Sequence, residues 1–301
     1  MLRRPPRIPP RRSGRAPAPA PSTPGIRTAW APRAPPASGG VRRSRPAVRP
    51  RARHREPAVN PAITAATAAR ILRQLKHDPR TVVLLVAVPT VLLFLLRYVF
   101  DDERLFDRIA PQLVAVFPFV VLFLVTSMAT LRERQSGTLE RLMTLPAGKL
   151  DLLFGYAAAF GLVAVVQVAA VVAAAQALGM EVEGELWTLG AIALADALLG
   201  IALGLLASAF ARTEFQVVQF MPAFIMPQVL LCGLFAPREE MHEVLEAVSY
   251  AMPLSYAVEA ITDATRSADV TGDLVVNTGV VLACAVLALV LGAATLRRRT
   301  P

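Results

Sequence analysis

Residues 132–151 read RERQSGTLERLMTLPAGKLD and hold seven charged side chains, two glycines and one proline. The segments on either side, 111–130 and 152–178, contain no Asp, Glu, Lys or Arg. An apolar run of about 20 residues is long enough to cross the hydrocarbon core of a bilayer as a helix. The sequence therefore predicts two membrane-spanning helices joined by a short polar loop.

The rest of the chain repeats this apolar pattern. Of its 301 residues, 54% are hydrophobic, whereas soluble domains average about 45–50%. The excess is concentrated in six runs, which are 81–100, 111–130, 153–178, 187–210, 215–236 and 274–296. We therefore expect an all-α integral membrane protein with six transmembrane helices.

The basic residues of the short loops predict how these helices are oriented. Lys and Arg are enriched in cytoplasmic loops. They gather before the first span, between the second and third, after the fourth and after the sixth, as Arg70, Arg73, Lys76, Arg80, Arg132, Arg134, Arg141, Lys149, Arg212, Arg297, Arg298 and Arg299. The opposite side is mostly acidic. Both termini are therefore expected in the cytoplasm, and the protein in the plasma membrane of a bacterium.

The N-terminal segment 1–57 differs from the remainder. It holds fifteen Arg, one Glu and fourteen Pro. Proline at this density prevents a regular helix, and the arginines repel one another, so we expect a disordered tail. Because no Met lies between Met1 and Met128, an alternative is that this tail is not translated and that the chain starts near Val59. The other residues carry 17 basic and 21 acidic side chains. The part of the chain after the tail therefore lacks the positive charge that would favour binding of nucleic acid.

Residues 63–77, ITAATAARILRQLKH, precede the first span and have helical spacing. The expected apolar face consists of Ala65, Ala68, Leu72 and Leu75, and the expected polar face of Arg70, Arg73 and His77. This pattern predicts an amphipathic helix lying on the cytoplasmic membrane surface, in contact with lipids. Asp78-Pro79 predicts a turn after it, because proline disfavours a helical residue before it.

The charged loop itself contains the signals of a short helix. Gly137 is expected to end the preceding helix and Thr138 to cap the next one. Leu139, Leu142 and Met143 then form one apolar stripe, while Glu140 and Arg141 point elsewhere; Pro146 ends the helix. Two interpretations remain open on composition: a solvated connector, or a knob that fits a groove on a cytoplasmic partner.

Two segments of the chain resemble the ABC-2 type permeases, the membrane subunits of ATP-driven exporters. The first, residues 132–155, matches the family pattern at Glu133, Arg134, Gly137, Thr138, Glu140, Leu142, Thr144 and Pro146. The second, residues 233–261, matches at Gly233, Phe235, Pro237, Pro253, Leu254, Ser255 and Tyr256. The sequence departs from the pattern at Gln135, Tyr156, Met241-His242 and Ala251-Met252. The resemblance covers residues 63–299, so the domain is expected over 58–301.

The resemblance implies a mechanism. A separate ATPase, which binds ATP and Mg²⁺, would dock on the surface helix and on the loop and move both. The implied surface-helix residues are Arg70, Leu72, Arg73 and Leu75, and the implied coupling-loop residues are Glu133, Gly137, Thr138, Leu139, Glu140, Arg141, Leu142, Met143 and Pro146. Two permease chains, identical or similar, would form a dimer. Residues 234–261 would form a re-entrant helical segment in the outer leaflet.

This chain is not expected to be an enzyme or to bind a cofactor. The phosphate-binding pattern G-x-x-x-x-G-K-[ST] does not occur, since Gly148-Lys149 is followed by Leu150. No cluster of His, Cys or carboxylates suggests a metal or catalytic site.

Polar residues within the spans are candidates for a translocation path. An ionised Asp at the bilayer centre costs about 2.5–3.5 kcal/mol on insertion scales, so Asp196 should face the protein interior. Asp196 and Gln219 either contact substrate or make structural hydrogen bonds. Gly200 and Gly204 form a GxxxG pattern that permits close helix packing. Pro222 and Pro227 predict kinks in the fifth span.

The functional expectation is a permease that exports a hydrophobic drug-like or lipid substrate. A polysaccharide or lipid-linked glycan exporter is an alternative within the same class. A membrane-embedded enzyme and a non-transporting membrane sensor are alternatives from other classes. The sequence does not identify the substrate.

Overall fold

The computed structural model describes residues 60–138 and 149–295, which all belong to one compact unit, His54–Pro301. These residues form helices and connections, without a strand among them. The expected tail, 1–57, and the last arginines, 297–299, lie outside the described residues. So does most of the charged loop, from Leu139 to Gly148.

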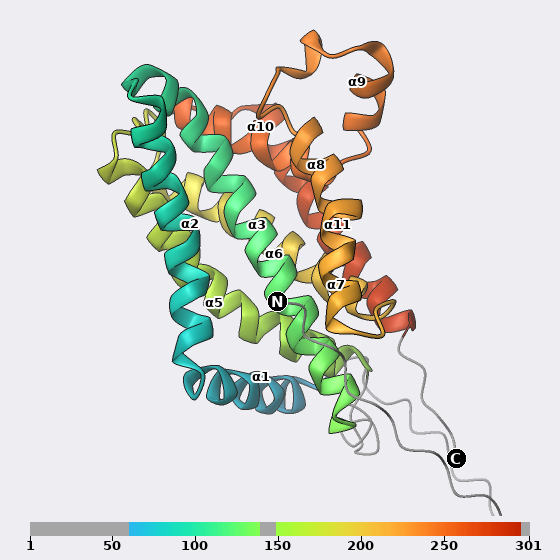
Figure 1. Ribbon diagram of the computed structural model, residues 1–301. Helices are drawn as coiled ribbons and strands as arrows, with labels where there is room; N and C mark the ends of the chain where they lie inside the picture. Colours follow the sequence, from blue (N-terminus) through green and yellow to red (C-terminus); the bar gives the residue numbers. More distant parts are fainter. Residues whose placement is uncertain (1–59, 139–148, 296–301) are drawn as a thin grey trace, which may run out of the picture. The chain divides into compact units, whose positions relative to one another are not determined.

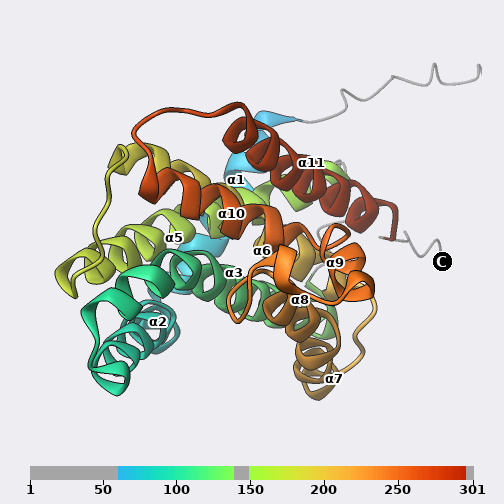
Figure 2. The same cartoon turned by 90° about the horizontal axis from the view of Figure 1, so that it is seen from above.

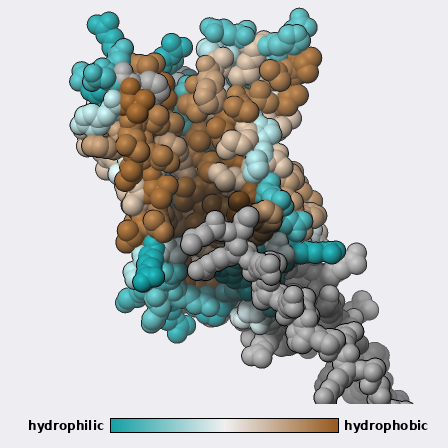
Figure 3. Space-filling view, in the orientation of Figure 1, coloured by the Kyte–Doolittle hydropathy of each residue, from teal (hydrophilic) through white to brown (hydrophobic). Residues whose placement is uncertain are grey.

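Six helices make up most of the unit. They are α1 (Pro61–Lys76), α2 (Pro79–Phe100), α3 (Glu103–Gln135), α5 (Lys149–Ala177), α6 (Leu186–Ser208) and α11 (Gly272–Thr295). All but α1 are long and apolar enough to cross a membrane. Figure 3 shows a hydrophobic band across one face, with hydrophilic residues above and below it. The chain is a multi-pass membrane protein.

Side-chain caps set the starts of the first three helices. Asn60, Asp78 and Asp102 each accept a hydrogen bond from a backbone N–H in the first turn of the helix that follows. Pro61 and Pro79 occupy the first helical positions, where no N–H is needed. The predicted break at Asp78-Pro79 is confirmed. In Figure 1, α1 runs across the lower ends of the long helices.

The centre of the unit is the contact between α3 and α6. Figure 2 shows α6 surrounded by α3, α5, α10 and α11. A Cβ atom built on Gly200 would lie 2.5 Å from the carbonyl oxygen of Phe119. One built on Gly204 would lie 2.6 Å from that of Phe123. Only glycine allows the two backbones to come this close, so the close packing predicted from the GxxxG pattern is confirmed.

The fifth expected span, 215–236, is shorter and less regular than predicted. Its helical part consists of α7 (Glu214–Phe220), one π-helical turn (Met221–Ile225) and α8 (Met226–Leu231). Pro222 and Pro227 lack the N–H that would continue the α-helical hydrogen bonds, which accounts for the irregularity. The α-helix is interrupted at the two prolines, as a π-helical turn, while a kink of its axis stays a prediction. Five helices, rather than six, meet the length and composition of a span among the described residues.

The segment between α8 and α11 forms a cap at the end of the unit opposite to α1 (Figure 1). It contains a 3₁₀ turn (Arg238–Glu240), α9 (Glu243–Ser249) and α10 (Pro253–Arg266). α10 is well buried and packs against α11, α3 and α6. The connection between α5 and α6 is fastened to it by the N–H of Glu183, which donates to the carbonyl of Thr265 at 2.8 Å. That this segment is re-entrant in a membrane stays a prediction.

Candidate functional site

The candidate site is the base of the charged loop, where α3 ends next to α1, α5 and α7. α3 runs to Gln135, and Ser136 caps its last turn. Gly137 then has a φ of +70°, in the left-handed region that L-residues avoid. The predicted end of the helix at Gly137 is confirmed. The chain thus leaves the helix in a direction that a glycine fixes.

An ion pair joins the last turn of α3 to the surface helix α1. The Arg70 guanidinium donates from Nη1 and Nη2 to the two carboxylate oxygens of Glu133, each at 2.9 Å. This two-pronged geometry is the strongest that an Arg and a carboxylate adopt. The side chains are 24% and 14% exposed. Water therefore screens this pair less than a surface pair.

The same guanidinium reaches a third helix. Arg70 Nη2 also donates to the Tyr156 hydroxyl of α5 at 3.2 Å. One arginine thus connects α1, the stem of the loop and the span that leaves the loop. We name Arg70, Glu133 and Tyr156 the stem triad.

Close backbone packing holds α1 against α5 beside the stem triad. A Cβ atom on Gly155 would lie 2.6 Å from the Cβ of Thr67. At the start of α1, the backbone N–H of Asn60 donates to the Asp151 carboxylate of α5. α1 and α5 are therefore joined by a hydrogen bond at one point and by close packing at Gly155 at another.

A second link joins the stem to the start of α7. Arg132 pairs with Glu214, with Nε 2.7 Å from Oε1 and Nη2 3.2 Å from Oε2. Gln135 donates to the carbonyl of Arg212 at 2.9 Å. The hydrogen bond and the charge of Arg132 lower the pKa of the Glu214 carboxyl. This link is more exposed than the stem triad, so we expect it to be weaker.

The prediction did not name the residues that α1 buries against the rest of the protein. They are Thr67 and Ile71. Ala65, assigned to the apolar face, is exposed. Arg70, assigned to the polar face, faces the protein, because its long side chain reaches Glu133. The predicted helix is present, but its amphipathic placement on a membrane stays a prediction.

The other predicted site residues fall into three groups. Leu72 and Leu75 are partly buried, whereas Arg73 is exposed, and among the described residues its guanidinium donates only to the carbonyl of Ala69 in its own helix. Thr138 is the last described residue before the gap, and its hydroxyl lies 2.9 Å from that of Ser136. Outside the described residues lie Leu139, Glu140, Arg141, Leu142, Met143 and Pro146.

The two candidates for a translocation path lie in different environments. Asp196 is fully buried in α6, and neither of its carboxylate oxygens has a hydrogen-bond partner in the described structure. Its predicted interior position is confirmed. Gln219 lies on an exposed face of α7. The structure therefore does not enclose the two in one buried site, and a shared role stays a prediction.

Sequence reasoning missed Tyr156, Gly155, Thr67 and Asp151 as members of the site. Tyr156 stood out only as a departure from the family pattern. Contacts between residues 86 positions apart, such as Arg70 and Tyr156, are not visible in a single sequence.

Comparison with known proteins shows the family of the chain. Residues 62–265 match the family described as ABC-2 type transporter. The chain is 26% identical over 196 residues to the probable multidrug ABC transporter permease YbhS of Escherichia coli K12, a match that covers 64% of this chain and 52% of YbhS. It is 28% identical over 170 residues to the probable multidrug ABC transporter permease YbhR of the same organism, which covers 56% of this chain and 46% of YbhR.

A more distant relative comes from a eukaryote. The ABC transporter G family member 20 of Dictyostelium discoideum is 22% identical over 163 residues, which covers 54% of this chain and 22% of that protein. The chain spans about half the length of the YbhS and YbhR proteins that it matches. The family match extends over more than half of the chain and includes the stem of the loop and the helices around it. The chain therefore belongs to the ABC-2 type transporter family, as a membrane-embedded permease.

Proposed function

We propose that this protein is the membrane subunit of an ABC exporter that moves a hydrophobic drug-like or lipid substrate out of the cell. The stem triad is the observation that carries the proposal. It connects the surface helix, the loop and the next span through one guanidinium. A force on the loop would therefore reach α1, α3 and α5 together. The names of YbhS and YbhR as probable multidrug permeases support the substrate class.

The driving force comes from a separate ATPase subunit that binds ATP and Mg²⁺. It docks on the 132–151 loop and on α1; the described ends of the loop, 132–138 and 149–151, lie with α1 at one end of the unit. Both chain termini are on this cytoplasmic side, and the cap of α9 and α10 faces outward. The basic residues on the loop side support this orientation.

The first prediction tests docking of the loop. Apolar anchors carry most of the energy of an interface, and rim charges carry little. Leu142→Asp should therefore reduce ATP-driven export at least about tenfold, whereas Glu140→Ala should reduce it much less. The measurement is export together with substrate-stimulated ATP hydrolysis, in vesicles that contain the permease and its ATPase. Normal export by Leu142→Asp, at normal abundance in the membrane, would mean that the loop is only a connector.

A second prediction concerns assembly. A closing ATPase dimer has two docking surfaces, and one chain has one coupling loop. We therefore expect two permease chains, identical or similar, with two ATPase subunits. Native mass spectrometry of the active complex measures this directly. A stable and active complex of one permease with one ATPase would contradict it.

A further inference from the structure

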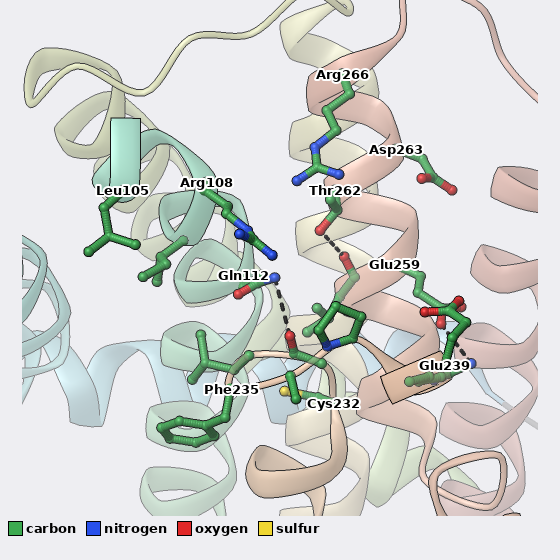
Figure 4. Close-up of a pocket in the computed structure, with 17 residues that line it drawn as sticks. Leu105, Arg108, Gln112, Cys232, Phe235, Glu239, Glu259, Thr262, Asp263 and Arg266 are labelled. Carbon is green, nitrogen blue, oxygen red and sulfur yellow. Dashed lines mark hydrogen bonds and ion pairs between the residues drawn. The ribbon is translucent and has the colours of Figure 1, made fainter. Parts of the chain in front are cut away.

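A polar cavity of about 400 Å³ lies between α3, α10 and the segment that follows α8 (Figure 4). It is at the end of the unit that we propose to face outward. Its charged lining residues are Arg108 from α3, Arg238 and Glu239 from the 3₁₀ turn, and Glu259, Asp263 and Arg266 from α10. None of the residues that line this cavity belongs to the stem triad or to the coupling loop.

Two of these six charges neutralise each other. Arg238 Nη1 lies 2.8 Å from Glu259 Oε1, and the Arg238 side chain is only 6% exposed. Its guanidinium also lies over the rings of Tyr250 and Tyr256, at 5.2 and 4.9 Å from their centroids. Arg238 and Glu259 therefore neutralise each other in the wall of the cavity, while Nε and Nη2 of Arg238 are buried and have no hydrogen-bond partner in the described structure.

Arg108 and Arg266 make no ion pair with another side chain among the described residues, although the charge of Arg266 acts on the Asp263 carboxyl. Neither guanidinium joins an ion pair or a hydrogen bond among the described residues, and both residues are exposed. Figure 4 shows both guanidinium groups pointing into the gap between α3 and α10, from opposite sides. In the same view Asp263 points away from the gap, and Glu239 lies beside Glu259. The mouth of the cavity is therefore lined by two guanidinium groups that form no ion pair in the part of the chain that the structure describes.

Deeper in the cavity, Gln112 presents an unused acceptor. Its Nε2 donates to the carbonyl of Gly233 at 3.4 Å. Its Oε1 is buried and has no partner in the described structure. A buried acceptor without a partner costs about 1–3 kcal/mol. A hydroxyl group on a ligand would satisfy it.

One side of the cavity carries apolar residues in addition to the polar side chains of Arg108 and Gln112. Leu105, Ile109 and Phe235 are among its lining residues, and Phe235 is 71% exposed. Leu105 and Phe235 both lie on that side in Figure 4. A ligand with its charge between the two arginines would have its apolar part beside these side chains. The cavity therefore fits an amphiphile better than a free ion.

We propose that this cavity binds an amphiphile with an anionic, hydroxyl-bearing headgroup, such as a phosphate ester. Arg108 and Arg266 hold the anion, Gln112 accepts from the hydroxyl, and the apolar tail leaves past Leu105 and Phe235. That this amphiphile is a transported molecule rests on the proposed function; its binding does not.

The test uses the purified full-length permease in nanodiscs of neutral phosphatidylcholine, without an ATPase. Fluorescent lysophosphatidylglycerol is titrated, and lysophosphatidylcholine serves as the probe in which an ammonium group neutralises the phosphate. We expect saturable binding of the anionic probe, at least about tenfold tighter than that of the zwitterionic one. Arg108→Gln and Arg266→Gln should each weaken binding about tenfold, since each removes a charge-assisted hydrogen bond. Arg108→Lys should retain part of the affinity.

Arg104→Gln is the matched control. Arg104 lies one turn from Arg108 on α3, is exposed, and does not line the cavity. Its replacement should leave binding unchanged. If Arg104→Gln weakens binding as much as Arg108→Gln, the probe responds to general surface charge, and the proposal is wrong. The thermal midpoint of each variant shows whether it is folded, and Arg266→Gln on α10 tests the site independently of α3.

A competition arm separates a lipid from a free phosphate. Glycerol 1-phosphate carries the same headgroup without a tail and should not displace the lipid probe at millimolar concentration. Full displacement would show that the tail contributes nothing and would overturn the assignment to an amphiphile. ATP-driven export is measured separately. Intact binding without any export would contradict the proposed function and leave the site standing.

Discussion

Glu133→Arg is expected to reduce ATP-driven export at least about tenfold. In the native protein the Glu133 carboxylate neutralises Arg70, with both side chains mostly buried. The substitution would place two guanidinium groups against each other and remove the link from the loop stem to α1. Removing one partner of a fully buried pair costs about 3–5 kcal/mol, and the remaining exposure reduces this cost. The measurement is export in vesicles that contain the ATPase, at matched abundance of the permease.

The reversed pair is the decisive comparison. Arg70→Glu/Glu133→Arg restores opposite charges at the same two positions, and the Tyr156 hydroxyl can donate to the new carboxylate. We expect this double variant to recover a large part of the export that each single variant loses. Lys76→Glu is the matched control, because Lys76 is exposed on the same helix and has no acidic partner in the described structure. Equal loss in the control would mean that the net charge of α1, not the pair, determines export.

If the Arg70–Glu133 pair only stabilises the fold, its loss should change export in a different way from the loss of a coupling contact. Glu133→Gln keeps a hydrogen-bond acceptor but loses the charge. A purely structural role predicts that export falls only as far as the amount of folded permease falls. A coupling role predicts folded permease whose ATPase partner hydrolyses ATP without a matching rate of export. The ratio of ATP hydrolysed to substrate moved therefore separates the two roles.

Local signals in the sequence predicted the boundaries of several elements. Asp78-Pro79 separates α1 from α2, because proline fixes the backbone at the first position of a helix. Gly137 ends α3, because glycine adopts a positive φ without strain. These features depend on one or two neighbouring residues. They can therefore be read without knowledge of the tertiary structure.

The stem triad could not be predicted in the same way. Arg70 and Glu133 are 63 positions apart, and their pairing depends on how α1 lies against α3 and α5. Helical periodicity placed Arg70 on a polar face together with Arg73 and His77. Periodicity describes which residues share a face, but it does not show which charge will meet an opposite charge from another helix. The same reason explains why Tyr156 was missed.

The fifth expected span shows a different limit. Hydropathy predicted one continuous span over 215–236, and composition alone gave no reason to shorten it. The structure ends the last helical piece at Leu231, and Gly233 follows with a φ of +95°. Ser255 of α10 donates to the carbonyl of Leu231 at 3.2 Å, which satisfies an acceptor that the ended helix leaves free. A tertiary contact thus sets an end that hydropathy cannot detect.

The contact between α3 and α6 gives the second large expected effect. Gly204→Ala should destabilise the protein, because the new Cβ would lie 2.6 Å from the backbone oxygen of Phe123. Backbone atoms cannot rotate away, so the two helices must separate, and overpacking of this kind costs about 1–3 kcal/mol or more. Gly200→Ala should act alike through Phe119, and the two together should prevent folding. The measurement is the midpoint of thermal unfolding in detergent, with abundance in the membrane as a second readout.

Gly190→Ala, in the same helix, is not expected to lower the midpoint of thermal unfolding. No atom lies within 4 Å of a Cβ built on Gly190. Alanine there gains about 1 kcal/mol of helix propensity without a clash, so the midpoint should stay level or rise. The same substitution in one helix thus has opposite effects, depending only on whether a neighbouring backbone lies against it. If Gly204→Ala unfolds at the same temperature as Gly190→Ala, then α3 and α6 are not in close contact, and the buried position of Asp196, about two turns from Gly204, loses its structural basis.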